Sequence, residues 1–290
     1  MRTLLALAFT LATPALAAPA KTPSEIVAAA PAADWRDIPA DDLMVMDLAS
    51  GRRVVIALAP AFAPVHIANI RALVRGGWFD SNAIIRVQDN YVTQWGGADP
   101  KRPAPAGVTP TPPAEYERPL EGLKITPLGS PDSYAKTAGF AGGWPVASDG
   151  KSAWLPHCYG MVGVGRDMPP DTGTGAELYT VIGHAPRNLD RNIALVGRVI
   201  DGMDALSALP RGTAEMGCYA DPRENTGITR ARLASDMPAS ERPRYQLLAT
   251  DTRTFATYLH ARANRGDGFY IRAAGAVDIC NAPVPTRPAP

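Results

Sequence analysis

The sequence lacks the short motifs that mark metal, nucleotide and common hydrolase sites. It contains no C-x-x-C, H-x-x-x-H or H-E-x-x-H spacing, no G-x-x-x-x-G-K-[ST] phosphate loop and no G-x-S-x-G nucleophile motif. The glycine pairs 163/165 and 173/175 do not continue into a dinucleotide fingerprint. His157 and Cys158 are adjacent, but no further ligand stands at zinc spacing. We therefore expect no metal and no cofactor.

An excess of charge of one sign is also missing. The 290 residues carry 29 Lys and Arg against 28 Asp and Glu, which gives a net charge of +1. No basic block favours nucleic acid, and no basic amphipathic helix favours a membrane surface. Beyond the N-terminus no apolar run approaches the ~20 residues that cross a bilayer. We expect a monomer that neither binds nucleic acid nor inserts into a membrane.

The first 17 residues have the pattern of a secretory signal peptide. Arg2 supplies a positive charge, residues 4–11 form a short apolar run, and small residues stand at Ala15 and Ala17. A buried N-terminal helix is the alternative, and it fits the cleavage pattern less well. The sequence therefore predicts a mature chain that begins near Ala18 and lies in the periplasm.

Cysteine is scarce, with Cys158, Cys218 and Cys280 only. In an oxidising compartment two of three can pair. Cys158 opens a strand candidate and Cys280 follows a strand-like segment, whereas Cys218 lies in a Gly- and Pro-flanked loop. We expect a disulfide between Cys158 and Cys280, which would tie the C-terminal part to the rest; Cys218 could pair instead.

Proline and glycine are abundant, at 29 and 26 residues, and they cluster in segments. Residues 18–41 are rich in Ala and Pro, which favours a linker or a loosely packed N-terminal arm. Residues from about 99 to 152 read as a long, loop-rich insertion with a short strand at 123–125. A loop of this length is either functional or a packed surface excursion.

Hydrophobic periodicity predicts a mainly β protein. Segments 43–48 and 53–58 form a hairpin, and 64–76 has the 3.6-residue period of a helix, with Pro64 in its first turn. Further strands are expected at 84–87, 91–95, 158–165, 177–182, 193–199 and 228–233, with a short helix at 202–206. Short strands with two helices favour a closed β-barrel whose ends the helices cover.

The chain beyond residue 235 has a mixed pattern. We expect a helix at 251–263 and strand-like segments at 269–272 and 276–279, followed by a proline-rich tail. So short a segment buries little core alone. Residues 236–290 are therefore expected to form an α/β extension that packs on the barrel.

Residues 54–99 resemble the opening of the cyclophilin family of peptidyl-prolyl cis-trans isomerases, or rotamases. Val-Val-Ile-Ala-Leu, Ala-Pro, a helix and Gly-Trp-Phe-Asp precede the signature Arg86-x4-Tyr91-Val92-x-Gln94-Trp95-Gly-Gly. Residues 160–165 resemble the family's Met-Ala-x-Ala-Gly strand, and 175–179 stand where the family has Gly-Ser-Gln-Phe-Phe. The resemblance covers about 42–235, broken by the insertion, and implies a cyclophilin-like barrel in a divergent exported member.

The resemblance also implies site residues. Arg86 would be catalytic and Gln94 would hold a peptide carbonyl. The rest of the substrate-binding set would be Tyr91, Val92, Val162, Gly163, Tyr179 and Leu189. Several positions depart from the family: Ile84-Ile85 replaces Phe-His, Glu177 replaces a glutamine, Asn188 stands at a frequent tryptophan, and Asn192 or Ile193 at a histidine.

The resemblance implies a peptidyl-prolyl isomerase that acts on proline-containing segments of exported proteins. The alternative is a catalytically weak proline-peptide-binding module or chaperone on the same fold. The groove substitutions favour the binding module, whereas retention of Arg86 and Gln94 favours the enzyme.

Overall fold

The computed structural model describes residues 20–97 and 102–290. The predicted signal sequence, residues 1–17, lies outside the described residues, as do the first residues of the predicted insertion. In the described part of the chain, no helix is both long and apolar enough to span a membrane.

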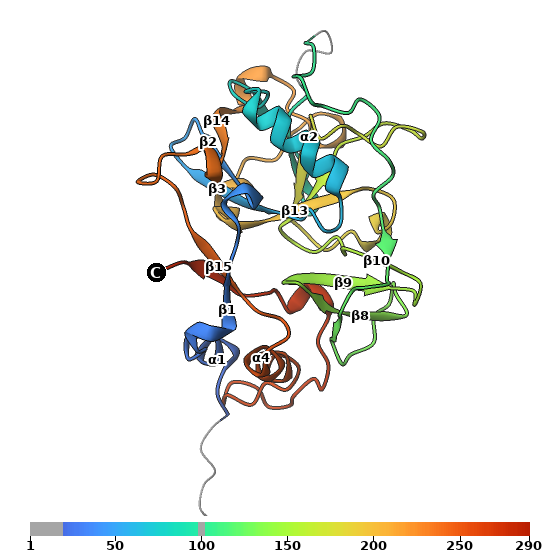
Figure 1. Cartoon of the computed structure of the whole chain (residues 1–290), viewed down its shortest axis with the longest axis vertical. Helices are drawn as coiled ribbons and strands as arrows, with labels where there is room; N and C mark the ends of the chain where they lie inside the picture. Colours follow the sequence, from blue (N-terminus) through green and yellow to red (C-terminus); the bar gives the residue numbers. More distant parts are fainter. Residues whose placement is uncertain (1–19, 98–101) are drawn as a thin grey trace, which may run out of the picture.

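Eight antiparallel strands close into a barrel, which confirms the predicted fold class. In Figure 1 the barrel occupies the upper part of the molecule. Side chains fill the interior of a barrel of this strand number. In barrel order the strands are β11 (Met161–Val164), β12 (Leu178–Val181), β5 (Val92–Trp95), β4 (Ala83–Val87), β14 (Thr226–Leu233), β2 (Leu43–Leu48), β3 (Arg53–Leu58) and β13 (Leu195–Asp201).

The hairpin β2–β3 is apolar on both faces. Met44 and Ile56 point into the barrel, where they join its interior core. Their neighbours Val45 and Val55 belong to a second core on the outside of the barrel. Because successive strand residues point to opposite faces, this continuous apolar run indicates a wall that is covered on both sides.

Two helices complete the barrel's interior core. α2 (Pro64–Arg75) contributes Ile67, Ile70 and Leu73, and α3 (Met203–Ser207) contributes Leu206. The helical period predicted at 64–76 is thus the buried face of α2.

The insertion, which the sequence predicts as loop-rich with one short strand, contains a sheet. Five strands lie in the order β6-β10-β9-β8-β7. The strand expected at 123–125 begins later, at β7. The central hairpin turns at Gly142 and Gly143, both with positive φ, which glycine adopts without strain. The strands are β6 (Arg118–Pro119), β7 (Thr126–Pro127), β8 (Thr137–Ala141), β9 (Trp144–Ser148) and β10 (Ser152–Trp154).

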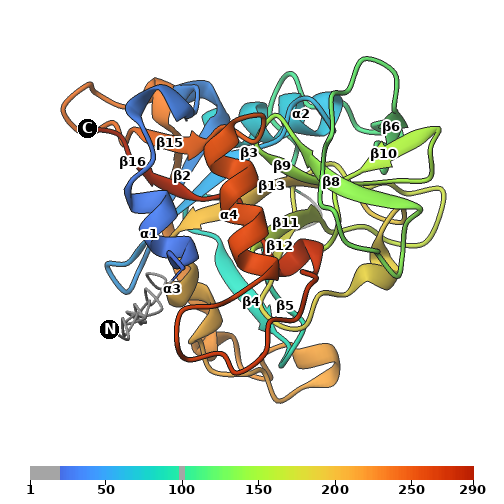
Figure 2. The same cartoon turned by 90° about the horizontal axis from the view of Figure 1, so that it is seen from below.

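The N- and C-terminal segments share a third sheet, in the order β1 (Trp35–Asp37), β15 (Tyr245–Leu248) and β16 (Thr286–Pro288). From residue 20 onward the N-terminal segment is therefore not a loose arm: Thr22 and Glu25 form a capping box on α1 (Pro23–Ala28). Figure 2 shows α1 beside α4 (Arg253–Ala263).

The strand-like segments expected at 269–272 and 276–279 form no strand in the described chain. Instead, residues 245–248 form β15, which pairs with β1 on one side. On its other side β15 pairs with β16, which comes from the proline-rich tail. Pro288 lies on β16, at the edge of the sheet, where its missing N–H costs no ladder bond.

One continuous core lies outside the barrel and joins all three sheets. Leu43 of the barrel, Phe140 of the insertion sheet and Phe255 of α4 belong to it. The rings of Phe140 and Phe255 meet edge to face, with their centroids 4.9 Å apart. A disulfide between Cys158 and Cys280, the pair favoured by the sequence, crosses the same region, and Cys218 is a free thiol.

Candidate functional site

The strand register brings four of the sequence-predicted residues into one row on the barrel's outer surface. Arg86 of β4 lies opposite Gln94 of β5, Gln94 opposite Tyr179 of β12, and Tyr179 opposite Gly163 of β11. Directly opposed residues on neighbouring strands share a face of the sheet. The row therefore follows from the barrel's hydrogen-bond register.

Arg86 is half-buried and each of its guanidinium nitrogens has a partner. Nε donates to the Met216 carbonyl at 2.7 Å, one terminal nitrogen donates to Oε1 of Gln94 at 2.8 Å, and the other donates to Gln88. The guanidinium also lies 5.6 Å from the centroid of the Tyr91 ring. A guanidinium has five N–H groups, so two remain for a ligand after these contacts. These contacts fix the orientation of the charged group.

A cavity of about 460 Å³ opens beside Arg86. This size is within the range of small-ligand sites. Six of the predicted site residues line it: Arg86, Tyr91, Val92, Gln94, Tyr179 and Leu189. Val92, Tyr179 and Val181 form a small apolar cluster, against which Tyr91 and Ile193 pack. The site is therefore a groove with an apolar patch beside the fixed cation of Arg86, and the rest of its lining includes the charged residues Arg166, Asp167, Asp171 and Glu177.

Val162 and Gly163, two further predicted site residues, do not line this cavity. Val162 is fully buried among the interior side chains of the barrel, because its position on β11 points inward. Gly163 lies behind the Tyr179 ring: a Cβ atom at this position would stand 2.3 Å from the ring atom Cζ. Gly163 thus packs against Tyr179, and it is the tyrosine that lines the groove.

The Tyr179 hydroxyl is held by a buried polar chain. It lies 3.0 Å from Nε2 of His157, and Nδ1 of His157 lies 3.0 Å from Oδ1 of Asp190. A carboxylate only accepts hydrogen bonds, so Nδ1 donates and Nε2 can accept from the hydroxyl. These hydrogen bonds link Tyr179, in the wall of the groove, to His157 and Asp190, which lie in the segments that connect the barrel strands.

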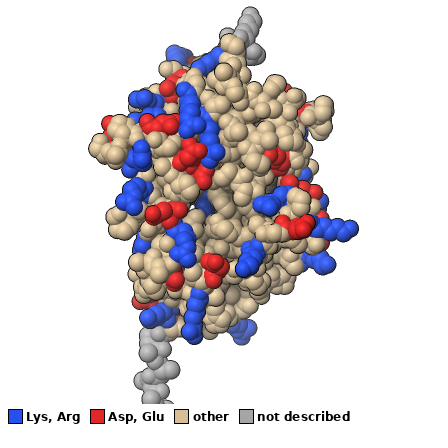
Figure 3. All heavy atoms as spheres, in the orientation of Figure 1, with Lys and Arg blue, Asp and Glu red and all other residues tan. Residues whose placement is uncertain are grey.

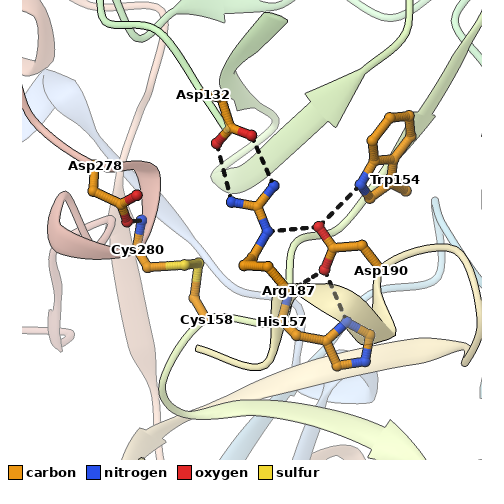
Figure 4. Close-up of a disulfide and its surroundings, with 8 residues drawn as sticks. All are labelled: Asp132, Trp154, His157, Cys158, Arg187, Asp190, Asp278 and Cys280. Carbon is orange, nitrogen blue, oxygen red and sulfur yellow. Dashed lines mark hydrogen bonds and ion pairs between the residues drawn. A yellow bond between two sulfur atoms is a disulfide. The ribbon is translucent and has the colours of Figure 1, made fainter. Parts of the chain in front are cut away.

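Arg187 extends this chain into the insertion. Its Nε donates to Asp190 at 2.6 Å and its two terminal nitrogens donate to Asp132 at 3.0 and 3.1 Å. Trp154 donates to the same oxygen of Asp190, Oδ2, at 3.2 Å. Figure 4 shows these side chains beside the disulfide, whose Cys158 directly follows His157.

Charge compensation keeps the buried carboxylate of this chain ionised. Burial alone would raise the pKa of Asp190, but the hydrogen bond from His157 and the charge of Arg187 outweigh burial and hold the pKa below its ordinary value of 3.8. Burial also raises the pKa of Tyr179, so its hydroxyl stays a donor.

Several groove residues were not assigned from the sequence. Glu177 accepts a hydrogen bond from the Gln94 amide, and Met216 contributes both its carbonyl and a side chain that is 61% exposed. His157 was noted only for its neighbour Cys158. No spacing in the sequence links His157 to Tyr179 or Met216 to Arg86, because these contacts join distant segments.

Among residues 20–97 and 102–290, no group of three or more His, Cys, Asp or Glu side chains is arranged to hold a metal ion.

The fold is thus an eight-stranded closed barrel, and the site on its outer wall consists of an arginine, a glutamine and aromatic side chains. A family model for cyclophilin-type peptidyl-prolyl cis-trans isomerases matches residues 43–233. A probable peptidyl-prolyl cis-trans isomerase of Brucella suis is 26% identical over 207 residues, which cover 68% of this chain and 84% of the relative. A Brucella abortus protein of the same description matches with the same identity and coverage.

The crystal structure of cyclophilin AquaCyp293 from Hirschia baltica has a similar fold. It superimposes with a TM-score of 0.68 at 25% sequence identity, and the match covers 88% of this chain and 93% of that chain. The chain belongs to the cyclophilin-type peptidyl-prolyl cis-trans isomerase family and is an enzyme of that class.

Proposed function

We propose that the groove beside Arg86 binds proline-containing segments of exported polypeptides and that Arg86 lowers the barrier to rotation of their X-Pro bonds. That barrier is about 18–20 kcal/mol because rotation removes amide resonance. Without a catalyst the exchange takes tens to hundreds of seconds. A catalyst needs only to bind the twisted amide more tightly than the planar one.

The proposed role of Arg86 follows from the electronic change in the amide. As the bond twists, the proline nitrogen becomes pyramidal and gains a lone pair that can accept a hydrogen bond. A guanidinium N–H that is fixed in place can donate to it, and this interaction is absent in the planar ground state. A thousandfold acceleration needs only ~4 kcal/mol of such preference.

The observation that carries this proposal is the fixed guanidinium beside the apolar patch of the groove. Tyr91, Val92, Tyr179 and Leu189 would hold the proline ring, and Gln94 would hold a peptide carbonyl. Two N–H groups of Arg86 remain unused by its contacts with Met216, Gln94 and Gln88.

Substitution of Arg86 tests the mechanism. Arg86→Ala and Arg86→Lys should each lower kcat/KM for an Ala-Pro peptide by about 100-fold, the typical effect of removing one transition-state donor. Lysine keeps the charge but loses the planar fork. Arg230→Ala, at an exposed position on β14, is the matched control and should leave kcat/KM unchanged. Exchange measured by NMR, with thermal melting to check folding, gives the readout. Full activity in Arg86→Ala would refute the assignment.

One contact favours a second candidate, a proline-peptide-binding module with weak turnover. The Gln94 amide already donates one of its two N–H groups to Glu177, so only one is left for a substrate carbonyl. The same assay separates the two: a wild-type protein that binds the peptide by NMR titration without accelerating exchange would be a binding module.

We also propose that the protein works in the periplasm as a monomer. The signal pattern of residues 1–17 supports export, and the cysteine pair suits an oxidising compartment. N-terminal sequencing of the periplasmic fraction should give a start near Ala18. An intact Met1 in that fraction would exclude cleavage.

A further inference from the structure

A second cavity, of about 740 Å³, lies between the barrel and the two accessory sheets. Its lining shares no residue with that of the groove. Ala57 of β3 and Arg198 of β13 come from the barrel wall, Trp144 from β9 and Leu247 from β15. The cavity therefore exists only because the insertion and the terminal segments cover this side of the barrel.

The walls of this second cavity are mainly apolar. The large apolar side chains that line it are Ile38, Phe62, Leu123, Ile125, Trp144 and Leu247. Ligand sites of this size are typically apolar with a few polar groups that fix the ligand's orientation.

Arg198 supplies such a polar group. It lies opposite Ala57 on one side and Met161 on the other, and both of these residues belong to the core outside the barrel. Its side chain therefore points outward, toward the accessory sheets. The guanidinium lies 5.1 Å from the centroid of the Trp144 ring.

The charge of Arg198 has no counter-ion. Within residues 20–97 and 102–290, its guanidinium makes no hydrogen bond to the protein and lies within ion-pair distance of no carboxylate. Burial lowers its pKa to about 10. Arg198 is therefore still charged at neutral pH. Its side chain is half-buried, so the guanidinium keeps part of its contact with solvent and loses part of its hydration to the apolar walls. A bound anion would replace that lost hydration.

The other charged groups at the cavity limit the charge of a ligand. Asp37, Asp42 and Asp251 also line it, and so do two further cations, Arg36 and Lys124. Asp42 is paired with Arg71 at 2.5 Å, and Asp37 accepts a hydrogen bond from Gln246 at 2.7 Å. With three carboxylates and three cations in the lining, the cavity offers no net positive charge to a multiply charged anion such as a phosphate. A single carboxylate on a long apolar body needs only one cation, Arg198, among the apolar walls.

We propose that this second cavity binds an aliphatic monocarboxylate, with its carboxylate on Arg198 and its chain along the apolar wall that Leu123, Ile125 and Leu247 form. The guanidinium offers two parallel N–H donors to a carboxylate, and Trp144 holds the guanidinium plane from one side. The site is separate from the proline groove and does not depend on isomerase activity.

Isothermal titration with three probes of equal chain length tests the site. Dodecanoate and dodecyltrimethylammonium are added below their micelle concentrations, and dodecanol below its solubility limit. Dodecanoate should bind about tenfold or more tightly than dodecanol, because only the carboxylate pairs with the cation. The ammonium probe should bind more weakly than either. Equal affinity for dodecanoate and dodecanol would overturn the proposal.

Two variants locate the binding. Arg198→Leu should lose the preference for dodecanoate over dodecanol, and Arg230→Leu, at an exposed position, should keep it. Ile125→Trp fills the cavity and should weaken the binding of both probes without a change in peptide isomerisation. Retained preference in a folded Arg198→Leu protein, or unchanged binding in Ile125→Trp, would refute the site. If Arg198→Leu fails to fold, Ile125→Trp and the wild-type comparison decide.

Discussion

At the groove, Gly163 determines how closely the Tyr179 ring can lie against the barrel. The ring covers the place where a Cβ atom would be, so any side chain at position 163 displaces it. The hydroxyl, at the end of the ring that lies over Gly163, is held by His157 at 3.0 Å. Close packing and a hydrogen bond therefore fix the same end of Tyr179, as a residue that forms a binding surface requires.

Gly163→Ala should move Tyr179 and weaken peptide binding. We expect a loss of about 1–3 kcal/mol in the free energy of unfolding, the usual cost of overpacking. KM should rise more than kcat falls, because Arg86 keeps its contacts. Gly266→Ala is the control, since its methyl group would meet only Ala20, at 3.7 Å. Urea denaturation and steady-state kinetics measure both effects; unchanged KM would show that Tyr179 can shift without consequence.

Asp190 should make stability depend on pH in the acid range. Its pKa is lowered in the folded protein, below the ordinary value of 3.8. A carboxylate with a depressed pKa stabilises the fold above its unfolded pKa and loses that contribution as the pH falls through the folded pKa. The wild type should therefore lose stability below about pH 4, and Asp190→Asn should lose less over the same range.

Denaturation curves between pH 6 and the acid limit of folding test this effect. Asp190→Asn also removes an ion-pair partner of Arg187, which lowers stability at every pH. The comparison therefore uses only the slope of unfolding free energy against pH. Asp89→Asn removes an exposed pair with Arg211 and should hardly alter the slope. Parallel curves for wild type and Asp190→Asn would contradict the assignment.

At the scale of elements, the insertion caps a barrel helix. The first residue before α2 is Ala63, which offers no capping side chain. Glu115 takes that role, because its carboxylate accepts from the backbone N–H groups of Val65 and His66 at 2.9 and 3.0 Å. A negative charge at a helix N-terminus is also favourable for the helix dipole. His66 lies against the same carboxylate at 2.7 Å.

Glu115→Ala should therefore destabilise the barrel although Glu115 lies outside it in sequence. Loss of a helix cap costs about 1–2 kcal/mol, and Glu115→Gln should cost less because the amide oxygen still accepts. Glu117→Ala, which breaks an exposed pair with Arg191, is the control and should change stability by less than about 1 kcal/mol. Urea denaturation gives both values. Equal effects of the two alanine variants would argue against the cap.

The elements that the sequence predicts well are those with a local signal. The α2 helix has an apolar face of regular period, and the β2–β3 hairpin has a short Gly-containing turn. The insertion sheet has no such signal, because β6 and β7 are two residues long and prolines precede them. Their pairing comes from contacts between distant segments, which no local pattern contains.

In the groove, too, the sequence predicts what has a local signal and misses contacts between distant segments. The residues that line it on β4 and β5 follow from the resemblance to a family signature. The support of Tyr179 by His157, and of Arg86 by the Met216 carbonyl, depends on segments that the barrel brings together from far along the chain. These supports could not be inferred from spacing.

At the scale of the whole molecule, the accessory parts cover one side of the barrel and leave the groove open. The insertion sheet, the third sheet and α4 share a core with the outer faces of β2 and β3. Charged side chains of both signs are mixed over the face that Figure 3 shows, with no block of one sign. The C-terminal segment thus packs on the barrel through an apolar interface and a covalent link.

The disulfide between Cys158 and Cys280 should stabilise this assembly strongly. It joins residues 122 positions apart, so in the unfolded chain it closes a long loop and lowers conformational entropy. Reduction, or the double substitution Cys158→Ala and Cys280→Ala, should lower the free energy of unfolding by about 2–5 kcal/mol. The groove residues lie on barrel strands, so isomerase activity should persist below the new melting temperature. Cys218→Ser, at the free thiol, should have the same stability as the wild type with and without reductant. Equal stability of the oxidised and reduced wild type would show that the shared core alone holds the C-terminal segment to the barrel.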